Sequence, residues 1–247
     1  MVTKSSIKFI KSLKLKKYRI QEKRYLIEGR KGIEEALKAG IPIDQVIGTE
    51  NFGEKLKESD LLRDTVFQVI NQKILESVSS FQSNNTGVAV AQIVEETRKE
   101  ENGPRILLDG VRDPGNLGTI LRCLDWFGYK TLICSPDCAD FYNPKTLAAT
   151  MGSFARLRPI YTDLTDYCSQ RKDLPVYGMI PGGEPLEKVA LPAEAAYLLG
   201  SESHGIREPL MPWVKNKIAI TKFGGAESLN VAMATSILLY AMRSKPA

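Results

Sequence analysis

From Arg105 onwards, short apolar segments alternate with longer segments of helical pattern, and this alternation limits the fold more than any other feature of the sequence. The expected strands are 106–108, 131–134, 176–179, 197–199 and 218–220, and the expected helices are 117–127, 144–151, 164–171 and 229–242. Strands that alternate with helices favour a parallel sheet with helices packed against it. We therefore predict an α/β fold for this part of the chain.

The preceding part of the chain predicts a second, smaller α/β domain. Its strand patterns are 25–27, 45–48, 66–69 and 87–94, and its helical patterns are 29–39, 52–58 and 72–79. The run that follows is charged, lacks apolar anchors and ends in Gly-Pro, which indicates a linker. The sequence thus predicts a basic N-terminal arm or helix at 1–24, a small α/β domain at 25–94, a linker at 95–104 and a larger domain at 105–247.

The positive charge of the chain is concentrated in residues 1–24. This segment holds nine Lys or Arg residues and one acidic residue, a charge of +8, whereas the whole chain has a net charge of only +5. Such an arm is expected to contact the phosphates of a nucleic acid. Two alternatives stay open: a solvated helix without a partner, and a membrane-surface helix, because Ile7, Phe9, Ile10 and Leu13 could share an apolar face.

Several classes of protein are disfavoured by what the sequence lacks. It has no apolar run of the roughly 18 residues that a membrane span needs, and its N-terminus lacks the apolar core of a secretory signal. The four cysteines form no C-x-x-C pair, and His204 is the single histidine, so neither a zinc site nor a disulfide framework is expected. We expect a cytoplasmic protein without a bound metal.

Three polar, glycine-containing loops each follow an expected strand. In the first, within 109–122, Asn116 lies at the entrance of a helix, where free N–H groups favour anions, and Arg122 lies off the apolar stripe of that helix. An amide and an arginine so placed suit the binding of phosphate or ribose. The alternative is an asparagine that caps the helix and an arginine that is only solvated.

The other two loops are 198–205 and 218–230. Glu202 could accept hydrogen bonds from a ligand, orient an arginine or cap the helix that follows it, and Ser228 is a candidate cap of the last helix. In an open α/β sheet, ligands bind at the carboxyl ends of the strands. The Walker and dinucleotide-binding glycine motifs are missing. The residues alone therefore predict an α/β enzyme with a small-molecule site at the strand ends.

These loops, in this order, resemble the three signature motifs of the SpoU (TrmH-type) RNA ribose methyltransferases of the SPOUT superfamily. The matching segments are Asp113-Pro114-Gly115-Asn116 with Arg122, Gly200-Ser201-Glu202 with Gly205, and Ser228-Leu229-Asn230-Val231-Ala232. Residues 22–94 resemble the substrate-binding domain often fused ahead of that catalytic domain, which is similar to ribosomal protein L30e. The resemblance thus covers nearly the whole chain.

The resemblance implies a fold, a reaction and partners. The catalytic domain is expected to contain a parallel sheet with a deep trefoil knot, although knots are nearly absent from proteins. The reaction is the transfer of a methyl group from S-adenosylmethionine to a ribose 2′-hydroxyl of ribosomal or transfer RNA. The protein is expected to be a homodimer with its active sites at the interface.

The resemblance also implies the residues of the site. The backbone that contacts S-adenosylmethionine maps to Gly200, Ile220 and Leu229, and the catalytic polar set maps to Asn116, Arg122, Glu202, Ser228 and Asn230. The family's suggested base is the arginine, but a guanidinium keeps its proton in proteins. We therefore interpret Arg122 as a group that positions the substrate and stabilises charge. Glu202 would hold that guanidinium or the ribose, and Ser228 and Asn230 would orient the substrate or the loop.

Two alternative functions are consistent with parts of this pattern. One is a SPOUT enzyme that methylates a base nitrogen of transfer RNA, against which the Asn116 and Arg122 pair and the third motif argue. The other is a non-catalytic RNA-binding or ribosome-assembly factor, which would not need all five polar residues of the catalytic set. Ser203-His204 and Ala241 depart from the commoner residues of the family at positions that do not carry the chemistry.

Overall fold

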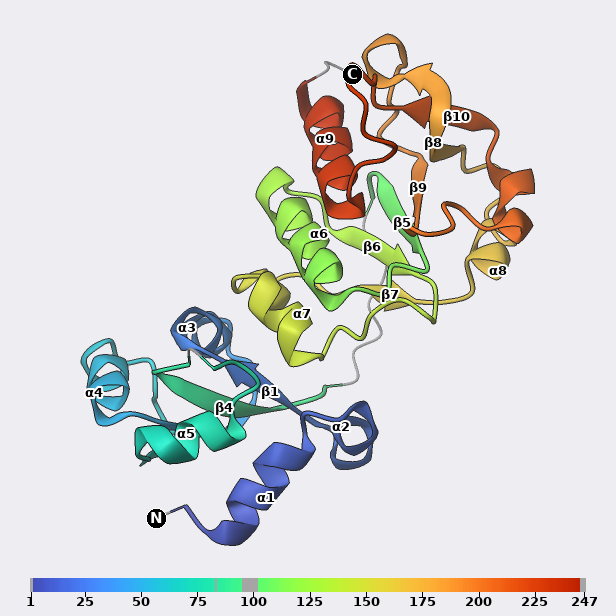
Figure 1. Cartoon of the computed structure of the whole chain (residues 1–247). Helices are drawn as coiled ribbons and strands as arrows, with labels where there is room; N and C mark the ends of the chain where they lie inside the picture. The colour runs from blue at the N-terminus through green and yellow to red at the C-terminus, as the bar shows by residue number, and fades with distance from the viewer. Residues whose placement is uncertain (1, 83, 95–101, 245–247) are drawn as a thin grey trace. The chain divides into compact units, whose positions relative to one another are not determined.

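The computed structural model describes residues 2–82, 84–94 and 102–244 (Figure 1). Contacts divide the chain into two compact units. One comprises Met1–Thr97 and Asp140–Arg156, and the other comprises Arg98–Ala139 and Leu157–Ala247. The segment Asp140–Arg156 thus packs within the first unit, although its sequence pattern suggested the larger domain. Most of the predicted linker 95–104 lies outside the described residues.

The first unit is built on a four-stranded mixed sheet in the order β1-β4-β2-β3. β4 pairs antiparallel with both of its neighbours, and β2 pairs parallel with β3. The strands are β1 (Arg24–Glu28), β2 (Ile43–Gly48), β3 (Phe67–Val69) and β4 (Gly87–Gln92). The helices are α1 (Lys4–Ser12), α2 (Lys16–Glu22), α3 (Arg30–Lys38), α4 (Glu50–Glu58), α5 (Gln72–Val78) and α7 (Pro144–Ala149), with a short 3-10 turn η1 (Ser153–Ala155).

The basic N-terminal segment packs into this unit instead of standing free as an arm. Ile10 and Leu13 are fully buried in a core that they share with residues of β1, β2 and β4. Their apolar face is therefore already covered, which contradicts the membrane-surface alternative. Arg19 is also buried: it donates to the carbonyl oxygens of Leu13 at 2.9 Å and Lys14 at 2.8 Å, and it forms an ion pair with Asp140 at 2.5 Å.

The segment Asp140–Arg156 contacts the first unit through several side chains. The ring of Tyr142 lies 4.7 Å from that of Tyr25, and Arg156 forms an ion pair with Glu35 at 2.7 Å. Gly152 has a φ of +98°, and a Cβ atom there would lie 2.5 Å from the Cγ atom of Glu35. Only glycine fits this position, because both the backbone conformation and the close approach of Glu35 exclude a side chain.

The second unit is built on a six-stranded sheet in the order β10-β8-β9-β5-β6-β7, and every neighbouring pair is parallel, as predicted. The strands are β5 (Arg105–Asp109), β6 (Thr131–Cys134), β7 (Ile160–Tyr161), β8 (Val176–Pro185), β9 (Ala196–Gly200) and β10 (Asn216–Ala219). The helices are α6 (Pro114–Phe127), α8 (Leu164–Ser169) and α9 (Val231–Ser244), with 3-10 turns η2 (Leu186–Lys188) and η3 (Glu208–Trp213). Sequence patterns missed β7 because two residues are too few to show a period.

The register of the central strands decides where the polar loops emerge. Asp109, the last residue of β5, is paired with Gly200, the last residue of β9, and Leu108 is paired with Cys134, the last residue of β6. The loops after these three strands therefore leave the sheet side by side at its carboxyl edge.

Among the described residues, no helix has both the length and the apolar character needed to cross a membrane.

Candidate active site

Three of the five polar residues predicted to carry the chemistry contact one another at the carboxyl edge of the parallel sheet. The side-chain amide of Asn116 donates a short hydrogen bond to Glu202 Oε1. Asn230 Nδ2 in turn donates to Asn116 Oδ1 at 2.9 Å. The three residues follow β5, β9 and β10, respectively, so the parallel sheet brings together side chains that are far apart in the sequence.

Asn116 is free to make these contacts because another residue caps its helix. The N-cap of α6 is Asp113, whose Oδ1 atom accepts a hydrogen bond from the backbone N–H of Asn116 at 2.8 Å. Pro114 occupies the first turn, where its missing N–H costs nothing. The capping alternative for Asn116 is therefore wrong, and its side chain is left to bridge Glu202 and Asn230.

The prediction that Ser228 caps the last helix is also wrong. That helix, α9, begins at Val231 instead of Leu229, and Asn230 Oδ1 accepts hydrogen bonds from the backbone N–H groups of Ala232 at 2.9 Å and Met233 at 3.4 Å. Serine and asparagine are both favoured caps, so the local sequence could not choose between them. Ser228 is exposed, and no hydrogen-bond partner of its hydroxyl is found within the described part of the chain.

Arg122 lies on the exposed surface of α6 and does not join the cluster. Within residues 2–82, 84–94 and 102–244, no acceptor contacts its guanidinium. The carboxylate of Glu202 accepts from Asn116 instead of holding Arg122. A single chain thus presents an assembled Asn116–Glu202–Asn230 cluster together with an arginine that is available to an incoming group.

The residues expected to contact S-adenosylmethionine lie along the same edge. A Cβ atom on Gly200 would lie 1.9 Å from the carbonyl carbon of Gly205, so the returning loop requires glycine there. Ile220 is half-buried directly after β10, and Leu229 is 48% exposed just before α9. The segment 221–228 between them has no helix or strand and is largely exposed, so its main chain and apolar side chains are open to a ligand.

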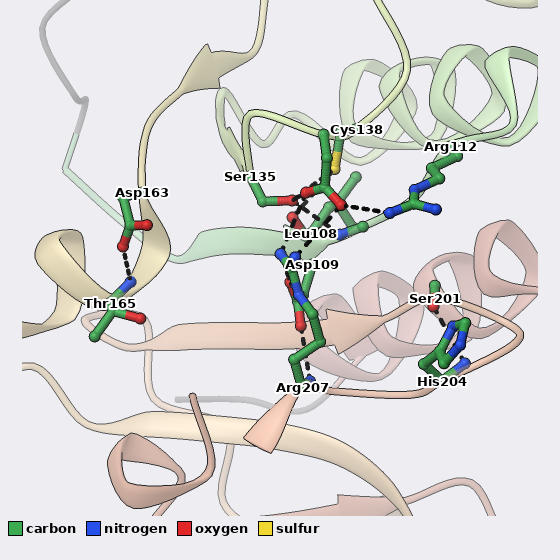
Figure 2. A network of polar contacts seen from close by, with 12 residues as sticks. Leu108, Asp109, Arg112, Ser135, Cys138, Asp163, Thr165, Ser201, His204 and Arg207 are labelled. Atoms are coloured by element: carbon green, nitrogen blue, oxygen red, sulfur yellow. Dashed lines mark hydrogen bonds and ion pairs between the residues drawn. The ribbon is translucent and has the colours of Figure 1, made fainter. Parts of the chain in front are cut away.

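Sequence reasoning missed a second polar network, which joins the loops that follow β5, β6 and β9 (Figure 2). The side chain of Asp109 is fully buried and accepts from Arg207 twice, from the backbone N–H at 2.8 Å and from Nε at 2.6 Å. The hydrogen bond to Asp109 raises the pKa of the Arg207 guanidinium above its ordinary value. One feature of the sequence could have revealed this network. Asp109 directly follows the apolar strand Ile106–Leu108, and a charge buried at the end of a strand requires a partner.

Asp137 extends the network to the loop after β6. Arg112 contacts its Oδ2 atom at 3.1 Å, Arg207 contacts its Oδ1 atom at 3.2 Å, and the hydroxyl of Ser135 donates to Oδ1 at 2.7 Å. Burial raises the pKa of Asp137, but the hydrogen bonds from Ser135 and Arg112 and the charge of Arg207 outweigh it, so the pKa is lowered overall. The carboxylate therefore stays ionised and can hold both arginines.

No group of three or more His, Cys, Asp or Glu side chains in the described residues is arranged to hold a metal ion. His204 is exposed in the loop after β9, and its Nδ1 atom lies 2.7 Å from the hydroxyl of Ser203. All four cysteines are free thiols. The polar chemistry of this edge is thus that of amides, carboxylates and arginines.

Comparison with known proteins identifies both parts of the chain. The profile of the SpoU rRNA Methylase family matches residues 103–240, and that of the MRM3-like substrate binding domain matches residues 4–89. The chain is 30% identical over 241 residues to the 23S rRNA (guanosine(2553)-2′-O)-methyltransferase RlmP of Bacillus subtilis, covering 96% of this chain and 95% of that protein.

Solved structures agree over nearly the full length. A protein of the TrmH family from Porphyromonas gingivalis is 32% identical, with a TM-score of 0.84 over 98% of both chains. The AdoMet-bound rRNA methyltransferase of Sinorhizobium meliloti is 25% identical, with a TM-score of 0.84 over 98% of this chain and 95% of that one. AdoMet is S-adenosylmethionine.

Proposed function

Because the chain belongs to the SpoU rRNA methylase family, we propose that it transfers a methyl group from S-adenosylmethionine to a ribose 2′-hydroxyl of RNA. The observation that carries this proposal is the Asn116–Glu202–Asn230 cluster, assembled where a ligand binds in a parallel sheet. Among the RNA classes we favour ribosomal RNA over transfer RNA, since the Bacillus subtilis relative is named for 23S rRNA.

The carboxyl edge of the sheet fits S-adenosylmethionine as the methyl donor. The main chain at Gly200, Ile220 and Leu229 would contact it, and the surrounding loops would complete the pocket. When bound, S-adenosylmethionine supplies a positively charged methyl sulfonium. The named Sinorhizobium meliloti relative, which has AdoMet bound, supports this assignment.

The chain's own side chains would position the ribose. Asn116, held between Glu202 and Asn230, presents a fixed polar group, and Arg122 offers a free guanidinium to the RNA backbone or to charge that develops on the ribose oxygen. Holding the hydroxyl in line with the methyl group can by itself contribute several kcal/mol, on the order of 7–11 in favourable cases. Ser228, exposed in the loop ahead of α9, would bind the substrate.

A homodimer would complete this site. Trp126 on α6 is 81% exposed, and Met233, Ile237 and Tyr240 on α9 are 62%, 40% and 63% exposed. The three residues of α9 recur at intervals of four and three, so they lie on one side of the helix. We therefore assign this α6 and α9 surface to the subunit interface. A second chain there would cover the apolar residues and bring polar groups toward Arg122, whose guanidinium contacts no acceptor in the described part of the chain.

Two further features of the family extend the proposal. The six-stranded parallel order of the second unit is consistent with the deep trefoil knot, which we propose for the C-terminal part of the chain. Residues 4–89 match the MRM3-like substrate binding domain, and we propose that this part of the chain is L30e-like and binds the RNA. We propose the cytoplasm as the place of action, where ribosomal RNA occurs and free thiols persist.

The deciding experiment maps methylation in RNA. Purified protein is incubated with S-adenosylmethionine that carries a labelled methyl group and with ribosomal RNA from cells that lack the gene. The label is expected on a ribose, resistant to alkaline cleavage at that nucleotide. A label on a base would favour the N-methyltransferase alternative. Binding of RNA without binding of S-adenosylmethionine in calorimetry would favour the non-catalytic alternative.

A further inference from the structure

We propose that Arg207 is a positioning residue for methyl transfer, because its ion pair with Asp109 fixes the loop 201–206 and with it Glu202. This inference rests on the function proposed above. Arg207 itself lies outside the Asn116–Glu202–Asn230 cluster, so it would act through Glu202 and not on the substrate. Figure 2 shows its side chain pointing toward Asp109 from the end of that loop.

The ion pair between Arg207 and Asp109 is a strong anchor for the loop, because water cannot reach Asp109 to take the place of Arg207. Its side chain is fully buried at the end of β5, and Arg207 meets both of its oxygens, one through the backbone and one through the guanidinium. Removing one partner of a buried ion pair leaves an uncompensated charge, which is strongly unfavourable. The chain is therefore held at Arg207 although this residue lies in no strand.

The loop that carries Glu202 is fixed at both of its ends. It leaves the sheet at Gly200, which is paired with Asp109, and it returns to the same Asp109 at Arg207. Between these points, Ser201 and Gly205 exchange two backbone hydrogen bonds of 3.2 Å and 2.9 Å, which close the base of the loop. Glu202 projects from this closed loop, so its position follows from where Arg207 is held.

Asp137 connects the same anchor to the loop that carries Asn116. It contacts Arg207 at 3.2 Å and Arg112 at 3.1 Å, and Arg112 lies in the turn that leads into α6. Ser135, which donates to Asp137, accepts from the backbone N–H of Gly110 at 2.9 Å. One network therefore holds the loops on both sides of the hydrogen bond between Asn116 and Glu202.

A double-mutant cycle between Arg207 and Glu202 tests the inference. Arg207→Ala is expected to lower the single-turnover rate of methyl transfer by about 10-fold or more, the loss expected when a charge-assisted hydrogen bond no longer holds a catalytic group. In a Glu202→Ala background, with S-adenosylmethionine at saturating concentration, the same change is expected to have little further effect, because there is no side chain left to position. Losses that multiply in the double variant would overturn the inference.

The conservative and control variants separate positioning from folding. Asp109→Asn leaves no buried charge without a partner, so we expect it to fold even if Arg207→Ala does not. It is expected to lower the rate in the same non-additive way. The matched control is Arg105→Ala, which breaks an ion pair of 2.8 Å with Glu194 at the opposite end of β5. We expect it to leave the rate unchanged. An equal rate loss in this control would refute a specific role for Arg207.

Hydrogen exchange gives a readout that does not depend on methyl transfer. Arg207→Ala or Asp109→Asn is expected to speed exchange of the backbone N–H of Gly205 at least several-fold, while the amides of β6 keep their protection. Unchanged exchange in the loop would overturn the inference even if the rate falls. If the wild-type protein transfers no methyl group, the proposed function fails, and the exchange data alone decide whether Arg207 holds the loop.

Discussion

The side-chain amide of Asn116 donates a hydrogen bond to Glu202, a residue that lies 86 positions further along the chain. The same asparagine accepts from Asn230, so one half-buried amide joins the loops that follow three strands of the sheet. An amide can serve both partners because it offers a donor and an acceptor at once. A carboxylate or an ammonium at this position would lose one of the two contacts.

Asn230 has two roles that a pair of substitutions can separate. Asn230→Asp keeps an oxygen that caps α9 but loses the amide that donates to Asn116. We expect it to keep the thermal midpoint and to lower the rate of methyl transfer by about 10-fold or more. Asn230→Ala is expected to lose activity and, in addition, about 1 kcal/mol of stability with the cap. Calorimetry and single-turnover assays measure the two effects, and equal stability losses in both variants would contradict this division.

Arg122→Ala is expected to abolish most of the methylation without changing the fold. Loss of one group that stabilises the transition state typically lowers a rate by about 100-fold to 1,000-fold. The side chain is exposed and contacts no acceptor in the described residues, so its removal should leave the thermal midpoint unchanged. Lys215→Ala, which removes another exposed cation of the same unit, serves as the control. A wild-type rate in Arg122→Ala would contradict the assignment.

The exposed lysines of α1 are expected to contribute to RNA affinity through phosphate contacts. Deleting residues 1–24 would not test this, because Ile10 and Leu13 are part of the core. The double substitution Lys8→Gln with Lys11→Gln should weaken binding and reduce the salt slope by up to about 0.9 per lost contact. The matched control substitutes the exposed Lys55 and Lys57 of α4. A salt slope that falls equally in both variants would argue against a specific role of α1.

The apolar surface of α9 is expected to hold two chains together. Met233→Glu or Ile237→Glu would place a charge in the proposed interface and should shift the mass in light scattering from twice the 27.4 kDa of one chain toward that value. Ile20→Glu is the control, since Ile20 is 64% exposed on α2 in the other unit. A wild-type protein that is monomeric at micromolar concentration would exclude the dimer.

The ion pair between Glu35 and Arg156 should make stability depend on pH. The hydrogen bond from Arg156, followed by that from Lys31, lowers the pKa of Glu35 below its ordinary value of 4.5. A lowered pKa in the folded state stabilises the fold above the unfolded value, and the contribution is lost as the pH falls through the folded value. The difference in unfolding free energy between wild type and Glu35→Gln should therefore be larger at pH 7 than at pH 3. No change with pH would rule out this contribution.

Local patterns were enough to predict most of the secondary structure. Helical and strand periods placed most helices and strands to within a few residues, because each depends on the spacing of nearby apolar side chains. The exceptions are β7, which was missed, and β8, which is longer than predicted. The polar loops after the strands drew attention to Asn116 and Glu202, and the resemblance to the SpoU motifs added Asn230. The helix caps were less certain, since Asp113 and Asn230 compete with neighbours of equal capping ability.

The tertiary structure alone decided which of these residues contact one another. The sheet order β9-β5-β6 and its register place Asp109 beside Gly200, and only then does Arg207 reach the buried carboxylate. The same is true of Arg19, which belongs to the basic segment expected to contact phosphates and whose guanidinium is buried against Asp140. Such contacts join residues about a hundred positions apart. Local spacing cannot predict them, because they depend on the order in which the strands pair.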